Sequence, residues 1–88
     1  MKYFYSTRNQ VCAQSIEVEI ENNTIVSVKF NGGCDGNHKG IAALAVGMQI
    51  NEAILRLAGI TCGMRNTSCP DQLACALKQY LQENIMHL

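Results

Sequence analysis

Eighty-eight residues, 48% of them hydrophobic and 16% charged, fit a single domain spanning residues 1–88 with one packed core. Seven basic and seven acidic side chains balance and are scattered along the chain, which excludes the basic footprint expected for nucleic acid or an anionic membrane surface. No apolar run has transmembrane length and the N-terminus lacks the apolar stretch of a secretory signal, so we expect a cytoplasmic location and neither a nucleic-acid nor a membrane partner.

The first predicted elements are the strands of an antiparallel sheet. Residues 15–21 alternate between apolar side chains and glutamate or serine, the period-two pattern of a strand with one wet face. Asn22 and Asn23 tolerate the positive φ of a tight turn, after which residues 25–30 resume the alternation. The aromatic-rich residues 2–5 are expected to add a third strand, because two strands alone are marginally stable in water. The inward side chains of residues 25–30 are predicted to be Val26, Val28 and Phe30.

Two short helices are predicted next. Turn-forming residues 31–37 end in Asn37, a favourable N-cap, and the helix that follows should stop at Gly47. A second helix is predicted from the N-cap Asn51 to Gly59. The apolar positions at helical spacing are Ile41, Leu44 and Ala45 in the first helix and Ile54, Leu57 and Ala58 in the second.

A last helix is predicted after a polar loop over residues 61–68. Pro70 takes the favoured first helical position, which leaves Cys69 as the N-cap. Strands followed by helices predict an α+β fold, in which a small antiparallel sheet from the N-terminal half is packed on one face against about three helices from the C-terminal half. The apolar stripe of the last helix is Leu73, Leu77, Tyr80 and Leu81.

Cysteines are the most informative residues of this chain. Five are many for this length, and an odd number without an export signal argues against a disulfide framework. Cys34 and Cys69 each lie in a polar loop just before a predicted helix, where free N–H groups and the helix dipole stabilise a thiolate. Cys62 lies in the loop that leads to Cys69. We therefore expect Cys34, Cys62 and Cys69 to converge as metal ligands or redox thiols.

A tetrahedral zinc or a closed iron–sulfur site needs a fourth ligand. The nearest candidates in the sequence are His38, Asp35 and Asp71. Each has a structural alternative, because a first-turn histidine is commonly exposed and helix-start acids complement the dipole. The cysteine spacing matches no zinc-finger pair, and loop thiols without function remain an alternative for all three. Cys12 and Cys75 are expected to be structural.

Residues 67–71 spell Thr-Ser-Cys-Pro-Asp, the signature from which the TSCPD domain family takes its name. Residues 32–40 (GGCDGNHKG), 59–63 (GITCG) and 72–74 (QLA) resemble the rest of its pattern, so the resemblance covers most of the chain. The chain is similar to the short stand-alone members. The family name also covers a module at the C-terminal end of adenosylcobalamin-dependent ribonucleotide reductases, which implies a link to deoxynucleotide and DNA synthesis.

A more distant resemblance is to iron–sulfur scaffold proteins of the NifU/IscU type, in which strands lead into a Gly-Cys loop and a cysteine precedes the last helix. It implies that Cys34 and Cys69 match the first and last scaffold cysteines. The middle scaffold cysteine, expected around residues 47–51, is absent, and Cys62 would have to replace it. This departure bears on cluster assembly and not on the fold.

The leading hypothesis is a metal-binding or iron–sulfur module with Cys34, Cys62 and Cys69 as ligands, whose partner is a ribonucleotide reductase or an iron–sulfur assembly protein. One alternative is a thiol-redox accessory to ribonucleotide reduction, and another is a structural interaction domain. A reductase needs a large barrel, so 88 residues are not a complete enzyme, and no phosphate loop, serine triad or carboxylate pair supplies a catalytic residue. The metal and the formation of a homo-oligomer stay open.

Overall fold

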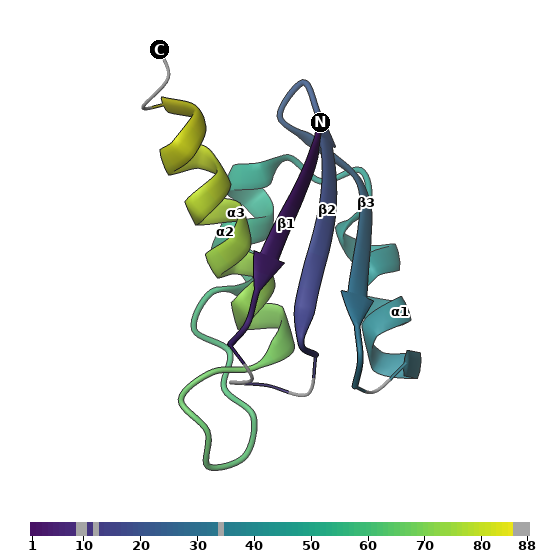
Figure 1. Cartoon of the computed structure of the whole chain (residues 1–88), viewed down its shortest axis with the longest axis vertical. Coiled ribbons are helices and arrows are strands. Elements are labelled where there is room, and N and C mark those ends of the chain that lie inside the picture. The colour runs from purple at the N-terminus through teal and green to yellow at the C-terminus, as the bar shows by residue number, and fades with distance from the viewer. Residues whose placement is uncertain (9–10, 12, 34, 86–88) are drawn as a thin grey trace.

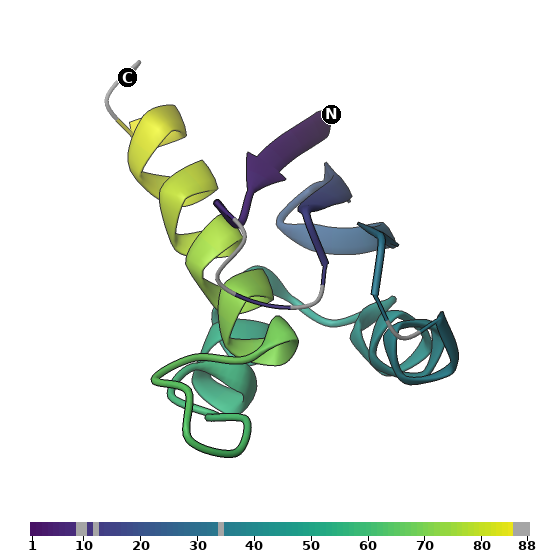
Figure 2. The ribbon, with the colours of Figure 1, turned by 60° about the horizontal axis from the view of Figure 1, so that its bottom comes forward.

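The structure is a computed structural model that describes residues 1–8, 11, 13–33 and 35–85. The strands form one layer in the order β1-β2-β3 with antiparallel neighbours, and the helices cover one face of this sheet (Figures 1 and 2). The predicted α+β arrangement is confirmed. The elements are β1 (Lys2–Ser6), β2 (Ser15–Glu21), β3 (Thr24–Asn31), α1 (Asp35–Ala45), α2 (Ile50–Leu57) and α3 (Cys69–Ile85).

The core lies between the sheet and the helices. Alternate residues of β2 are at most 2% exposed, and Leu73 and Leu77 of α3 are fully buried against them. Each such aliphatic side chain stabilises the fold by about 1.5–3 kcal/mol relative to an exposed position. The inward residues of β2 are Ile16, Val18 and Ile20.

The hairpin between β2 and β3 turns at Asn22 and Asn23, whose φ angles of 53° and 63° are the positive values that the sequence predicts. The register then shifts, because Ile20 pairs with Ile25 whereas Glu19 pairs with Ser27. Val26 is therefore an extra residue in a bulge. The prediction for this residue is wrong, since Val26 is 43% exposed and Ile25 takes the buried place.

The starts of α1 and α2 differ from prediction. α1 begins at Asp35, before the predicted cap Asn37. α2 begins at Ile50, with Gln49 as its N-cap instead of Asn51. The cause lies outside the helix, because the N–H of Ile50 donates to the carbonyl oxygen of Asn23 at 3.0 Å and thereby ties the start of α2 to the turn between β2 and β3.

α3 is capped by Ser68 rather than by the predicted Cys69. The Ser68 hydroxyl accepts the N–H of Asp71 at 3.2 Å, and its carbonyl accepts the N–H of Gln72 at 2.8 Å. A hydroxyl oxygen is a better acceptor than a thiol, which explains the difference. Cys69 is thus the first helical residue. Among the described residues, no helix is long and apolar enough to span a membrane.

Candidate functional site

The first turns of α1 and α3 lie at the same end of the sheet (Figure 1). There the Nε2 atom of His38 lies 3.1 Å from the Sγ atom of Cys69, although 31 positions separate the two residues. His38 is only 7% exposed, and Cys69 is partly buried. Two helix starts therefore bring an imidazole and a thiol into direct contact.

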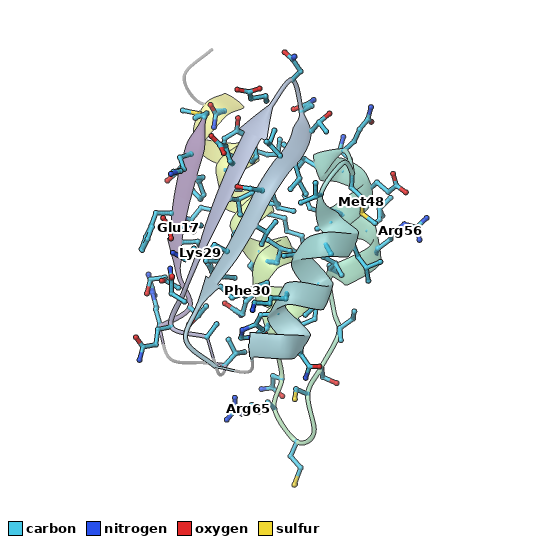
Figure 3. All side chains as sticks on the ribbon, turned by 90° about the vertical axis from the view of Figure 1, so that its right-hand side faces the viewer. Glu17, Lys29, Phe30, Met48, Arg56 and Arg65 are labelled. Carbon is cyan, nitrogen blue, oxygen red and sulfur yellow. The ribbon has the colours of Figure 1, made fainter. Side chains whose placement is uncertain are left out.

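The imidazole of His38 is held by an aromatic ring. Phe30 lies at the end of β3 beside the first turns of α1 (Figure 3), and its ring stacks on that of His38 with centroids 4.4 Å apart and an interplanar angle of 22°. A stacked and buried ring has few orientations available. The strand thus directs the imidazole towards Cys69. The contact itself is a hydrogen bond between nitrogen and sulfur whose donor depends on the protonation of the pair.

An open groove of about 540 Å³ adjoins the pair. One wall is α1 between residues 36 and 44, and the other consists of residues 60–62 and 68–70. Cys62, His38 and Cys69 all contribute to its lining, and Cys62 is exposed. Two of the predicted cysteines and the predicted histidine therefore face one space.

The other predicted ligands are placed differently. Cys34 lies outside the described residues, so its convergence with Cys62 and Cys69 stays a prediction. Asp35 begins α1, and its side chain is also outside the described part. Among the described residues, no three His, Cys, Asp or Glu side chains form a group that could hold a metal ion. Within the described part of the chain, two of the predicted ligands, His38 and Cys69, are in direct contact.

Both carboxylate oxygens of Asp71 already accept hydrogen bonds. Oδ1 accepts the backbone N–H of Gly59 at 2.7 Å, and Oδ2 accepts the hydroxyl of Thr67 at 2.5 Å. These contacts tie the two ends of the loop over residues 59–67 to the first turn of α3. The sequence alone predicts a ligand or a helix-start acid at this position. In the structure Asp71 joins Gly59 and Thr67 to α3, and we call this arrangement the loop clamp.

The neighbours of Asp71 in the signature complete this clamp. The hydroxyl of Ser68 donates to the carbonyl oxygen of Ile60 at 2.6 Å, and the amide Nε2 of Gln72 donates to the hydroxyl oxygen of Thr67 at 2.8 Å. The N–H of Cys62 donates to the carbonyl oxygen of Thr67 at 3.3 Å. The polar residues of the motif therefore hold Cys62 at the groove next to Cys69.

Of the two cysteines expected to be structural, Cys75 does not line the groove. Cys75 lies two turns along α3 from Cys69, and burial, followed by the charge of Asp71, raises the pKa of its thiol. This thiol is therefore neutral near pH 7. Cys12 lies outside the described residues.

The pair can serve two kinds of chemistry. Imidazole nitrogen and thiolate sulfur are both ligands that zinc and iron–sulfur centres accept. A thiol in contact with an imidazole can also pass its proton to the ring and act as a nucleophile. Phe30 and the packing of α1 supply the burial that either role requires, since both depend on a fixed imidazole.

Comparison with known proteins gives one match. The family model described as TSCPD domain matches residues 2–81, which is nearly the whole chain. Searches of the curated proteins and of the solved structures returned no match.

Proposed function

The chain belongs to the TSCPD domain family, and from the paired His38 and Cys69 we propose that it is a metal-binding module acting beside a larger catalytic chain. The observation that carries this proposal is the contact of 3.1 Å between Nε2 and Sγ. Two ligand-type atoms from separate helix starts meet in a partly buried setting. Zinc or an iron–sulfur cluster is the ligand class that such a pair suits.

Two further cysteines are the proposed remaining ligands. Cys34 directly precedes α1, about one helical turn before His38. Cys62 lines the same groove as Cys69 and is held there by the loop clamp. A set of three thiolates and one imidazole is a common structural zinc site. In this proposal Asp71 keeps its hydrogen bonds and does not bind the metal.

The spacing of the pair fits this proposal after a small adjustment. Nitrogen and sulfur ligands of one tetrahedral zinc lie about 3.5 Å apart, given bonds of about 2.0–2.1 and 2.3 Å. The present separation is 3.1 Å, so the two atoms have to part by about half an ångström. A modest rotation of the Cys69 side chain within its rotamer well provides such a shift without moving the helices.

Metal analysis of freshly purified, untagged protein tests the proposal. We expect zinc or iron near one equivalent per chain, or a multiple set by a cluster, and its loss from Cys69→Ser. Cys75→Ser is the matched control, since it removes a thiol from the same helix away from the groove, and it should keep the metal. Wild-type protein that is folded by circular dichroism and free of zinc and iron would contradict the proposal.

A second candidate is a thiol-redox accessory to ribonucleotide reduction. Direct contact between thiol and imidazole favours it, because 3.1 Å is a hydrogen-bond distance and needs no metal between the atoms. The partner is suggested by the module of the same name in adenosylcobalamin-dependent ribonucleotide reductases. A coupled assay of reductase turnover with and without this protein should show an effect that Cys69→Ser abolishes. Unchanged re-reduction of the enzyme would remove the reason to prefer this partner.

The NifU/IscU resemblance and the structural interaction domain stay predictions. The order of three strands followed by three helices is consistent with the first, and an iron–sulfur assembly protein would then be the partner. Wild-type protein that holds no metal, together with unchanged thermal stability after Cys69→Ser, would favour the second.

A further inference from the structure

The open edge of the sheet at β1 forms a second candidate binding surface. β1 is the outer strand next to β2, and α3 runs beside it in both ribbon views (Figures 1 and 2). The side-chain amide of Gln79 donates to the hydroxyl of Tyr3 at 2.8 Å, which joins α3 to this edge. Between the two elements lies a space of about 350 Å³, which we call the edge groove. Its lining residues are Phe4, Tyr5, Ser6, Arg8 and Gln79.

Backbone groups of β1 face the edge groove. Hydrogen-bonded pairs alternate with non-bonded pairs along two antiparallel strands. Met1 and Ile20 exchange both of their backbone hydrogen bonds, each at 2.8 Å, and the register between β1 and β2 continues without a shift. Every second residue from Met1 therefore bonds to β2, so the N–H and carbonyl groups of Phe4 and Ser6 point to the open edge. None of the described residues hydrogen-bonds to these groups.

β1 also lacks most of the features that protect an exposed edge from pairing. Natural edge strands commonly carry a proline, a bulge or several charged side chains. β1 has neither a proline nor a register shift, and its charged residue is Lys2 at its start. Backbone donors and acceptors that recur at every second residue match the backbone of another extended chain. The edge is therefore suited to the addition of a strand.

Arg8 places a positive charge at one end of the edge groove. Its side chain is exposed, and no described carboxylate forms an ion pair with it. Arg8 has a φ of 57°, which is uncommon for a residue other than glycine, and its N–H donates to the hydroxyl oxygen of Ser6 at 3.3 Å. The chain thus turns away at the end of β1 and leaves the guanidinium beside the groove. A carboxylate is the group that matches a free guanidinium in charge and shape.

We infer that the edge groove binds an extended, acidic segment of a partner polypeptide, which adds to β1 as a fourth strand. The segment runs antiparallel to β1, because antiparallel pairing is the more stable arrangement. Its first residue is an acid that pairs with Arg8, and its third and fifth residues pair with Ser6 and Phe4. Phe4 is 64% exposed, so a β-branched fifth residue packs against its ring.

This inference is independent of the metal-binding function proposed above. The edge groove shares no lining residue with the groove beside Cys69. Gln79 lies ten positions after Cys69 along α3, which corresponds to a rise of about 15 Å. Binding at the edge therefore requires neither a metal ion nor a free thiol, and either proposal can fail without the other.

Five-residue peptides with blocked ends test the inference by NMR titration of the isotope-labelled full chain as purified. The reference peptide has glutamate first, threonine at the next three positions and valine last. One control replaces the glutamate by lysine, and another exchanges the places of glutamate and valine. Two further peptides carry a single N-methyl group, either on the third amide, which faces β1 in the inferred pairing, or on the fourth, which faces away.

We expect the reference peptide to shift the amide signals of Phe4 and Ser6 and to slow their hydrogen exchange, because both N–H groups acquire partners. Methylation of the third amide should weaken binding by about five- to tenfold, since a backbone hydrogen bond is lost. Methylation of the fourth amide should leave the affinity unchanged. Equal affinities of the two methylated peptides, or no binding at several millimolar reference peptide, would overturn strand addition.

The charged controls test the acid and its place in the segment. The lysine peptide and the peptide with glutamate last should both bind about two- to fivefold more weakly than the reference peptide, the effect of an exposed ion pair. Tighter binding of the peptide with glutamate last would overturn the antiparallel arrangement. Lysine and glutamate peptides of equal affinity would overturn the preference for an acidic segment.

Two other occupants of the edge give different results in the same experiment. If N-acetylglutamate amide shifts the same signals with the affinity of the reference peptide, the ligand is a small anion and the inference is overturned. If the signals of Phe4 and Ser6 change with protein concentration before any peptide is added, and the chain sediments as a dimer, a second copy of this chain occupies the edge. That result would also overturn the inference.

A pair of variants separates the charge at the groove from the overall charge of the chain. Arg8→Gln and Lys78→Gln each remove a positive charge from an exposed side chain, and Lys78 does not line the edge groove. Arg8→Gln should weaken binding of the reference peptide by about two- to fivefold, and Lys78→Gln should leave it unchanged. Equal affinities of the two variants would overturn the contact between Arg8 and the acid.

Discussion

Replacing Asp71 with alanine tests whether this residue is a loop clamp. Its carboxylate accepts the N–H of Gly59 at 2.7 Å and the hydroxyl of Thr67 at 2.5 Å. Hydrogen bonds to a charged group contribute about 1.5–3 kcal/mol each when buried. The bond to Gly59 is exposed and the bond to Thr67 is partly buried, so we expect Asp71→Ala to lower the free energy of unfolding by about 2 kcal/mol in total. For a domain of this size that is a fall in Tm of about 8–16 °C.

Urea unfolding followed by far-UV circular dichroism measures the change. Asp71→Asn keeps an amide oxygen for the N–H of Gly59 but loses the charged acceptor for Thr67, so about half of the effect should remain. Glu52→Ala is the matched control, because its carboxylate also lies in a first helical turn but makes only an exposed ion pair with Arg56 at 3.1 Å. Such pairs are worth about 0.3–0.5 kcal/mol. A loss for Asp71→Ala no larger than that of Glu52→Ala would refute the clamp.

Further predictions concern the stability effects of two glycines, of a buried leucine and of the Cys75 thiol. Gly40→Ala should stabilise the fold by about 0.5–1 kcal/mol. Gly59→Ala should destabilise it by about 1–2 kcal/mol, because Gly59 has a φ of +86°. A lower urea midpoint for Gly40→Ala than for Gly59→Ala would contradict both predictions. Leu73→Ala should lower the free energy of unfolding by about 2–5 kcal/mol, because Leu73 is fully buried. Burial raises the pKa of Cys75 above its ordinary value of 9.0, so the unfolded chain loses this proton first and stability should fall as the pH rises above about 9. Cys75→Ala should flatten that fall in pH-dependent urea titrations, and an unchanged slope would show that Cys75 does not contribute to it.

The sheet is largely predictable from sequence because one of its faces is buried. Alternation along residues 15–21 places Ile16, Val18 and Ile20 in the core, as the structure shows. The bulge that exposes Val26 and buries Ile25 leaves no mark in the alternation, since both residues are apolar. Its position depends on how the two strands pair, which a local pattern does not contain.

Helix starts and the site depend on contacts between elements. Cys69 is found by its signature, but its contact with His38 requires α1 and α3 to dock at the same end of the sheet. A histidine in a first turn is usually exposed, whereas this one is 7% exposed, stacked on Phe30 and in contact with Cys69. An inward aromatic residue at the end of the preceding strand is the sequence signal that points to it. No sequence pattern indicates that Asp71 accepts a hydrogen bond from the N–H of Gly59, because the two residues are 12 positions apart.

The central claim is that His38 and Cys69 act as one site. A double-mutant cycle of zinc affinity, measured by competition with a chelator for wild type, His38→Gln, Cys69→Ser and the double variant, tests it most directly. If both side chains bind the same ion, the losses in zinc-binding free energy of the two single variants should add up to more than the loss of the double variant. The expected excess is about 0.5–3 kcal/mol, the coupling typical of contacting residues. Strictly additive losses, or zinc affinity that neither substitution changes, would contradict a shared site.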